Sequence, residues 1–155
     1  MTTIFLTCLV LIIFGHVNSF FISNRFINHR IKAYTHKFAI SNLNAELFQD
    51  IVDATLESEY PVVIDFQKSK CGPCIKIAPE LERLSQKYNG KVSFYKIDAD
   101  ASKEALKLMR SQGIRAVPTF HIWYKGEMVD VISGARVDEL DDSLRGTLMA
   151  NSLWE

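Results

Sequence analysis

Cysteine is scarce in this chain of 155 residues, which contains only three: Cys8, Cys71 and Cys74. Cys8 lies in an apolar N-terminal stretch, so the rest of the chain has one pair, too few for a small secreted domain held together by several disulfides. A zinc site would need two further ligands, and the sequence offers no second cysteine pair, while His121 is the only histidine after residue 36. The C-x-x-C pair therefore favours redox chemistry over zinc binding.

Acidic residues are absent from the first 45 positions, because all 18 of them lie at or after Glu46. The same region carries four basic residues, Arg25, Arg30, Lys32 and Lys37, and the other 14 basic residues follow it. A basic N-terminal leader thus precedes a mildly acidic domain, although the formal net charge of the chain is zero. This distribution argues against nucleic acid as a partner.

The N-terminal apolar stretch is too short for an ordinary membrane span. It runs over 11 residues, from Ile4 to Phe14, which is the length of the hydrophobic region of a signal peptide. Val17 and Ser19 place small residues before a predicted cleavage site, so residues 1–19 are interpreted as a signal peptide whose removal leaves no stable membrane span. An uncleaved anchor is the alternative, because apolar residues continue through Ile22 and no Lys or Arg precedes the stretch.

Residues 20–36 are basic, rich in Asn, Ser and His, and free of acidic residues. This composition resembles a transit peptide. A transit peptide behind a signal peptide is similar to the bipartite targeting sequence of proteins imported into complex plastids such as the apicoplast. The alternative is a disordered basic spacer on a protein that stays in the secretory route or another lumenal compartment.

Hydrophobic periodicity predicts a single domain from residue 37 to residue 155. We expect strands at 37–40, 61–66, 91–97, 119–124 and 128–132, and helices at about 45–58, 74–88, 102–112 and 137–150. In the first helix Asn44 is the expected N-cap and Leu56 lies on the apolar face, whereas Pro79 should kink the second helix. Phe120 and Trp123 are expected in the core.

The predicted order of elements is β-α-β-α-β-α-β-β-α, which indicates an α/β fold. Parallel strands joined by crossover helices need cover on both faces of the sheet, and the pair Lys125-Gly126 is a hairpin signal. We therefore expect a central mixed sheet with helices on both faces, to which the hairpin adds antiparallel edge strands.

The stretch Lys70-Cys71-Gly72-Pro73-Cys74 lies where the strand 61–66 gives way to a helix. If Cys71 begins the helix, its sulfur faces unpaired backbone N–H groups and the positive end of the helix dipole, which stabilise the thiolate. Cys71 would then be the nucleophile, and Cys74, one turn along and more buried, would stay protonated until needed. Pro73 fits the first helical turn, and Gly72 keeps the approach to Cys71 open.

Six sequence segments together resemble the thioredoxin family in order and spacing, over about residues 37–150. They are Val63-Ile64-Asp65-Phe66, Cys71-Gly72-Pro73-Cys74, Ala78-Pro79, Lys96-Ile97-Asp98, Gly113 to Phe120, and Gly134-Ala135. The resemblance implies the thioredoxin fold and a thiol–disulfide oxidoreductase that reduces protein disulfides. It also implies that no bound cofactor or metal is needed and that an unidentified reductase supplies electrons.

The same resemblance implies catalytic roles for four residues. Cys71 resembles the attacking cysteine, Cys74 the resolving cysteine, Asp65 the buried acid below them, and Lys96 the lysine near that acid. An unpaired charge in an apolar strand is costly, so Asp65 should have a raised pKa or lie close to Lys96. The alternative is that Asp65 is a structural polar group near a strand end.

The remaining predicted site residues form the surface that contacts the substrate. Pro118 resembles the family's cis-proline facing the disulfide, and Val117 the residue whose backbone pairs with an extended substrate; an ordinary trans-proline is the alternative. The other members are Lys70, Gly72, Pro73, Gly134 and Ala135.

Two positions depart from the family pattern: Lys70 stands where tryptophan is usual, and Gln67 replaces a usual aromatic residue. The Lys70 ammonium favours the Cys71 thiolate by about 1 kcal/mol, whereas the missing indole removes roughly 1–3 kcal/mol of contact with a partner. We therefore expect Cys71 to remain reactive while acidic or less apolar targets are favoured.

Gly-Pro between the cysteines resembles the reducing members of the family. An isomerase or oxidase in a secretory lumen is one alternative, and a thioredoxin-fold binding or scaffold module of a larger assembly is another. We expect a monomer, because no cysteine is left over to bridge two chains once the leader is removed.

Overall fold

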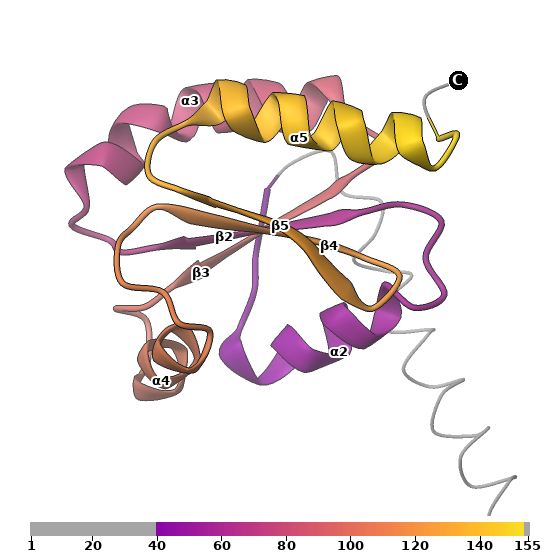
Figure 1. Cartoon of the computed structure of the whole chain (residues 1–155). Helices are drawn as coiled ribbons and strands as arrows, with labels where there is room; N and C mark the ends of the chain where they lie inside the picture. Colours follow the sequence, from indigo (N-terminus) through magenta and orange to yellow (C-terminus); the bar gives the residue numbers. More distant parts are fainter. Residues whose placement is uncertain (1–39, 154–155) are drawn as a thin grey trace, which may run out of the picture. The chain divides into compact units, whose positions relative to one another are not determined.

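The protein is described by a computed structural model in which residues 40–153 are placed (Figure 1). The predicted signal peptide, the basic spacer and most of the predicted first strand lie outside these residues. The elements are β1 (Ser41–Asn42), a 3-10 turn (Ala45–Leu47), α2 (Phe48–Ala54), β2 (Val62–Gln67), α3 (Gly72–Lys87), β3 (Ser93–Asp98), α4 (Lys103–Ser111), β4 (Thr119–Tyr124), β5 (Glu127–Ser133) and α5 (Val137–Ala150). Ile40, the one described residue of the predicted first strand, precedes β1 rather than forming part of it.

The five strands form one mixed sheet in the order β1-β3-β2-β4-β5. β1 and β2 are both parallel to β3, whereas β4 is antiparallel to β2 and to β5. The predicted hairpin forms, with Lys125 and Gly126 at φ values of 53° and 80°, which suits a tight two-residue turn. Of the two hairpin strands only β5 is at an edge of the sheet, because β4 also pairs with β2, so the expectation that both are edge strands is wrong.

Helices cover both faces of the sheet: α3 and α5 pack on one face, and α2 and α4 on the other (Figure 1). The central strand β2 is apolar on both sides for this reason. Val63 packs with residues of α3 and α5, whereas Ile64 and Phe66 pack with residues of α2 and α4. In α5, Leu140, Leu144 and Leu148 have no exposed surface, as their i, i+4, i+8 spacing predicts.

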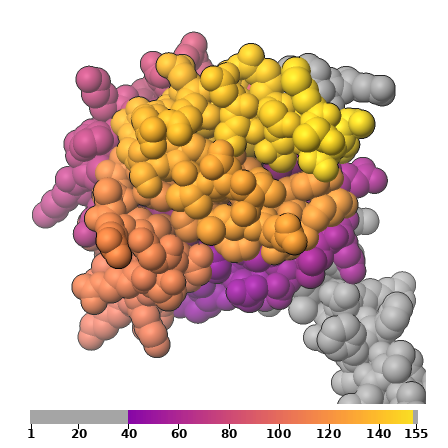
Figure 2. Space-filling model, in the orientation of Figure 1, coloured from indigo at the N-terminus to yellow at the C-terminus, as the bar shows by residue number. Residues whose placement is uncertain are grey.

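The edge strand β5 is far more exposed than the other strands. Met128, Val129 and Val131 keep 46%, 43% and 41% of their surface accessible. Figure 2 shows this part of the hairpin at the surface between α5 above and α2 below. Within residues 40–153 no helix has the length and apolar character needed to cross a bilayer.

The predicted first helix ends four residues earlier than expected, at Ala54. The Thr55 hydroxyl donates a hydrogen bond to the Val52 carbonyl (2.7 Å) and accepts one from the backbone N–H of Gly126 (2.9 Å). These bonds end the helix and join it to the β4–β5 turn, so Leu56 leaves the apolar face and is 60% exposed. Asn44 occupies the cap position, but its side chain makes no capping hydrogen bond.

Helices α3 and α4 begin within two residues of the predicted positions. The Ser102 hydroxyl accepts the N–H of Ala105 (3.0 Å) and caps α4. In α3, Cys71 holds the cap position, Pro73 lies in the first turn, and the helix continues through Pro79 to Lys87. The start of α3 therefore fixes the orientation of both cysteines.

Candidate active site

The loop between β2 and α3 is held by hydrogen bonds at both ends. Gln67 accepts the N–H of Ala99 (3.0 Å), and Lys68 accepts the N–H of Cys71 (3.2 Å). The Ser69 hydroxyl also donates to the Asp98 carboxylate at the end of β3. This last contact could not be predicted from the sequence, since no motif links two polar residues 29 positions apart.

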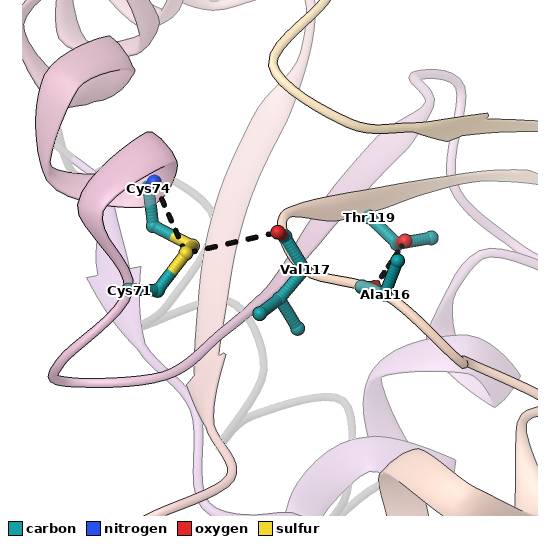
Figure 3. The surroundings of a disulfide bond; sticks show 5 residues. All are labelled: Cys71, Cys74, Ala116, Val117 and Thr119. Carbon is teal, nitrogen blue, oxygen red and sulfur yellow. Dashed lines mark hydrogen bonds between the residues drawn. A yellow bond between two sulfur atoms is a disulfide. The ribbon is translucent and has the colours of Figure 1, made fainter.

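Cys71 and Cys74 form a disulfide at the N-terminus of α3 (Figure 3). The Cys71 sulfur accepts the backbone N–H of Cys74 at 3.2 Å, so the sulfur itself caps the helix. Cys71 is 9% exposed and Cys74 is 4% exposed, which agrees with the predicted order of burial. After reduction, the same N–H group and the helix dipole would stabilise a thiolate on Cys71.

The loop before β4 approaches the disulfide from the side of the sheet. The Val117–Pro118 peptide is cis, as the family resemblance predicts. The Val117 carbonyl oxygen points toward the disulfide and lies 3.7 Å from the Cys71 sulfur (Figure 3). The Pro118 carbonyl accepts the N–H of Gly134 (2.7 Å), so the β5–α5 loop is attached to this loop.

Asp65 lies in the middle of β2, on the sheet face that α3 covers, because it alternates with Val63 of that core cluster. It is 4% exposed, and its Oδ1 atom has no hydrogen-bond partner among the described residues. Burial raises the pKa of Asp65 from 3.8 to about 7, and the nearby Lys96 charge partly offsets that increase. Lys96 is its register partner on β3, so the structure brings these two predicted site residues together.

The other predicted contact residues differ in how far they reach the surface. Lys70, Gly72 and Pro73 are exposed, and so is Ala135. A Cβ atom built on Gly72 would meet no atom within 4 Å, so the approach to the cysteines on this side is open. Gly134 has a φ of +91°, a backbone conformation that favours glycine.

A second group of buried polar residues lies on the opposite face of the sheet, against α2. His121 is 1% exposed, its ring centre is 4.9 Å from that of Phe66, and burial lowers its pKa to about 4. His121 Nδ1 and Trp123 Nε1 have no partner within the described chain. Phe120 is fully buried and Trp123 packs at the edge of the core, as predicted. No group of three or more potential metal ligands occurs in residues 40–153.

Three comparisons place this arrangement among known proteins. Residues 39–146 match the thioredoxin family model. Thioredoxin H-type of Chlamydomonas reinhardtii is 44% identical over 84 residues, which cover 54% of this chain and 72% of that protein.

Two solved structures are similar across most of the domain. Thioredoxin f from spinach chloroplast, in its long form, is 32% identical with a TM-score of 0.66 and covers 76% of this chain and 92% of its own. A chain in the crystal structure of a ferredoxin:thioredoxin reductase and thioredoxin f2 complex is 30% identical with a TM-score of 0.64. The match covers 72% of this chain and 97% of that chain. Together with the cysteine pair at the start of α3, these matches show that the chain belongs to the thioredoxin family and is a thiol–disulfide oxidoreductase.

Proposed function

We propose that this protein reduces disulfides in other proteins, with Cys71 as the nucleophile and Cys74 as the resolving cysteine. The observation that carries the proposal is the position of the Cys71 sulfur, which accepts a helix N-terminal N–H and lies 3.7 Å from the Val117 carbonyl. One thiol is thus activated by the helix, next to a backbone segment suited to hold an extended peptide.

In the first step the Cys71 thiolate attacks one sulfur of a substrate disulfide. A bond forms between Cys71 and that sulfur, the substrate S–S bond breaks, and the departing substrate sulfur leaves as a thiolate that takes up a proton from water. The backbone of Val117 would align the substrate strand, while Pro118, Gly134 and Ala135 would line the surface beside it.

In the second step Cys74 releases the substrate. The Cys74 thiol gives its proton to the Asp65 carboxylate and attacks the Cys71 sulfur. The Cys71–Cys74 bond forms, the mixed disulfide breaks, and the second substrate sulfur leaves as a thiolate that takes up a proton from water. Two electrons have then passed from the enzyme to the substrate. A pKa of about 7 leaves Asp65 able both to accept and to return a proton near neutral pH, and Lys96 would tune that balance.

A trapping experiment tests the assignment of the two cysteines. In full-length chain carrying Cys8→Ser, the additional change Cys74→Ser should accumulate a mixed disulfide between Cys71 and a model protein substrate. Cys71→Ser should accumulate none, since Cys74 is more buried and lacks the helix N–H contact. Accumulation of the adduct on Cys74 in the Cys71→Ser variant would reverse the assignment.

The direction of electron flow is part of the proposal. The Gly-Pro pair between the cysteines supports a reductase rather than a lumenal isomerase or oxidase. Equilibration with glutathione buffers should give a potential near the thioredoxin value of about −270 mV, whereas a value near −120 mV would indicate an oxidase. The electron donor would be a separate reductase, for which the complex of the related thioredoxin f2 with ferredoxin:thioredoxin reductase offers a precedent.

We further propose that residues 1–36 direct the protein to a complex plastid, with cleavage after residue 19 and then removal of the basic segment. The similarity to a spinach chloroplast thioredoxin supports a plastid compartment. A C-terminally tagged full-length chain should co-localise with a plastid marker. Retention in the endoplasmic reticulum would contradict the proposal.

We also propose that the processed protein is a monomer. Light scattering of the purified processed protein should give the mass of a single chain.

A further inference from the structure

Exposed cations lie on three loops at the end of the sheet where α3 begins. Lys70 directly precedes Cys71, Arg115 lies in the loop before the cis peptide, and Arg136 stands at the start of α5. All three side chains belong to exposed residues. The domain as a whole is mildly acidic, so this concentration of positive charge is local.

The order of strands in the sheet shows where these charged loops lie relative to one another. The three cationic loops follow β2, precede β4 and follow β5, and these strands are neighbours in the sheet. On the other side of β2, Asp98 ends β3 and Asp100 lies in the loop that follows it. The disulfide at the start of α3, after β2, therefore has Arg115 on the β4 side and Asp98 and Asp100 on the β3 side, which we call the acidic side. Over β5, Arg136 is followed by Asp138 and Glu139 in the first turn of α5.

Two of the three cations lack a compensating charge. Within residues 40–153, Arg136 forms an ion pair with Glu139 at 2.6 Å, whereas neither Lys70 nor Arg115 takes part in any ion pair. On the acidic side, Asp98 is already engaged by the Ser69 hydroxyl and by the N–H of Asp100. Lys70 and Arg115 are thus the cations free to attract a partner.

We propose that the preferred substrates are protein disulfides flanked by Asp or Glu residues that lie over the β2 and β4 loops, within reach of Lys70 and Arg115. The inference rests on the proposed function, because it concerns the partner of the same disulfide. One charge pair about 7 Å apart in water changes affinity about threefold, so two cations together give roughly tenfold. The effect should vanish near 1 M salt, where the Debye length is about 3 Å.

The test compares two peptides that each contain one disulfide and differ only in flanking residues, Glu in one and the uncharged Gln in the other. The measured quantity is the second-order rate constant for their reduction by the reduced full-length chain. We expect the Glu peptide to react roughly tenfold faster at low salt and the two rates to converge at 1 M salt. Lys70→Gln combined with Arg115→Gln should abolish the preference, whereas the matched control Lys125→Gln, at the opposite end of β4, should keep it.

The outcomes separate the two proposals. Equal rates for both peptides, or a preference that persists in the double variant, would overturn the inference about substrates and leave the reductase function standing. If neither peptide is reduced while the protein is fully folded, the proposed function itself fails, and the inference fails with it.

Discussion

The buried carboxyl of Asp65 makes the stability of this domain depend on pH in a way that a single substitution should reveal. Burial raises its pKa from 3.8 to about 7, so between these values the native state keeps a proton that the unfolded state has released. Stability must then fall as pH rises through this window, by about 1.4 kcal/mol per pH unit and by about 4 kcal/mol in all. Above pH 7 the full cost of the buried charge is present.

Asp65→Asn removes this titration while keeping the shape of the side chain. Between pH 4 and pH 7 the variant should gain about 1.4 kcal/mol per pH unit relative to the wild type. The new amide donors have no evident partners and cost about 1–3 kcal/mol, so the net gain at pH 8 should be about 2 kcal/mol. Guanidinium unfolding of the oxidised full-length chain, followed by circular dichroism, measures the difference.

His121 provides a comparison in which the dependence of stability on pH has the opposite sign. Burial lowers its pKa from 6.5 to about 4, so in this window the unfolded state binds a proton that the native state does not. Its contribution to stability is therefore lost as pH falls, and His121→Gln should gain relative to the wild type toward low pH. An Asp65→Asn difference that is constant from pH 4 to pH 8 would refute the argument that burial raises the pKa of this carboxyl.

Three further predictions concern other parts of the fold and site. Thr55→Val removes a hydroxyl that hydrogen-bonds both Val52 and Gly126, and it should destabilise the domain by about 1–3 kcal/mol in denaturant unfolding. Thr55→Ser keeps the hydroxyl and should retain most of that stability. Equal losses in the two variants would show that these hydrogen bonds do not stabilise the domain. Leu144→Ala truncates a side chain with no exposed surface and should cost about 2–5 kcal/mol, and a loss below 1 kcal/mol would mean that α5 is not packed as described. Lys70→Trp should change the alkylation rate of Cys71 by no more than a few-fold and should raise the turnover of an insulin-type disulfide substrate. If the variant and the wild type show the same turnover and trap the same partners, residue 70 does not determine substrate choice.

The sequence predicted the elements whose patterns are local. The bounds of β4 and α5 agree with the structure, because strand alternation and i, i+4 spacing depend only on neighbouring residues. The early end of α2 could not be predicted in this way, since it depends on a hydrogen bond between Thr55 and Gly126, which are 71 positions apart. The exposure of Leu56 follows from that same distant contact.

The candidate site was predictable to a different extent for each residue. The placement of Cys71 at the helix start followed from spacing alone, whereas the cis state of Pro118 and the pairing of Asp65 with Lys96 came from the family resemblance. The contact of Ser69 with Asp98 was not foreseen, because it joins a loop to a strand end with no sequence signal. The position of Arg115 across β2 from Asp98 and Asp100 could be found only from the sheet order, which places β3 and β4 on opposite sides of β2.

The most direct test of the account is the pH dependence of alkylation of the reduced full-length chain, with peptide mass mapping to separate Cys71 from Cys74 and Cys8. An ordinary thiol titrates near pH 8.5, and a thiol at a helix N-terminus titrates lower. We predict that Cys71 reacts first, with a midpoint clearly below 8.5, and that Cys74 reacts slowly. A midpoint for Cys71 at or above 8.5, or faster labelling of Cys74, would contradict the central claim that the helix activates the Cys71 sulfur.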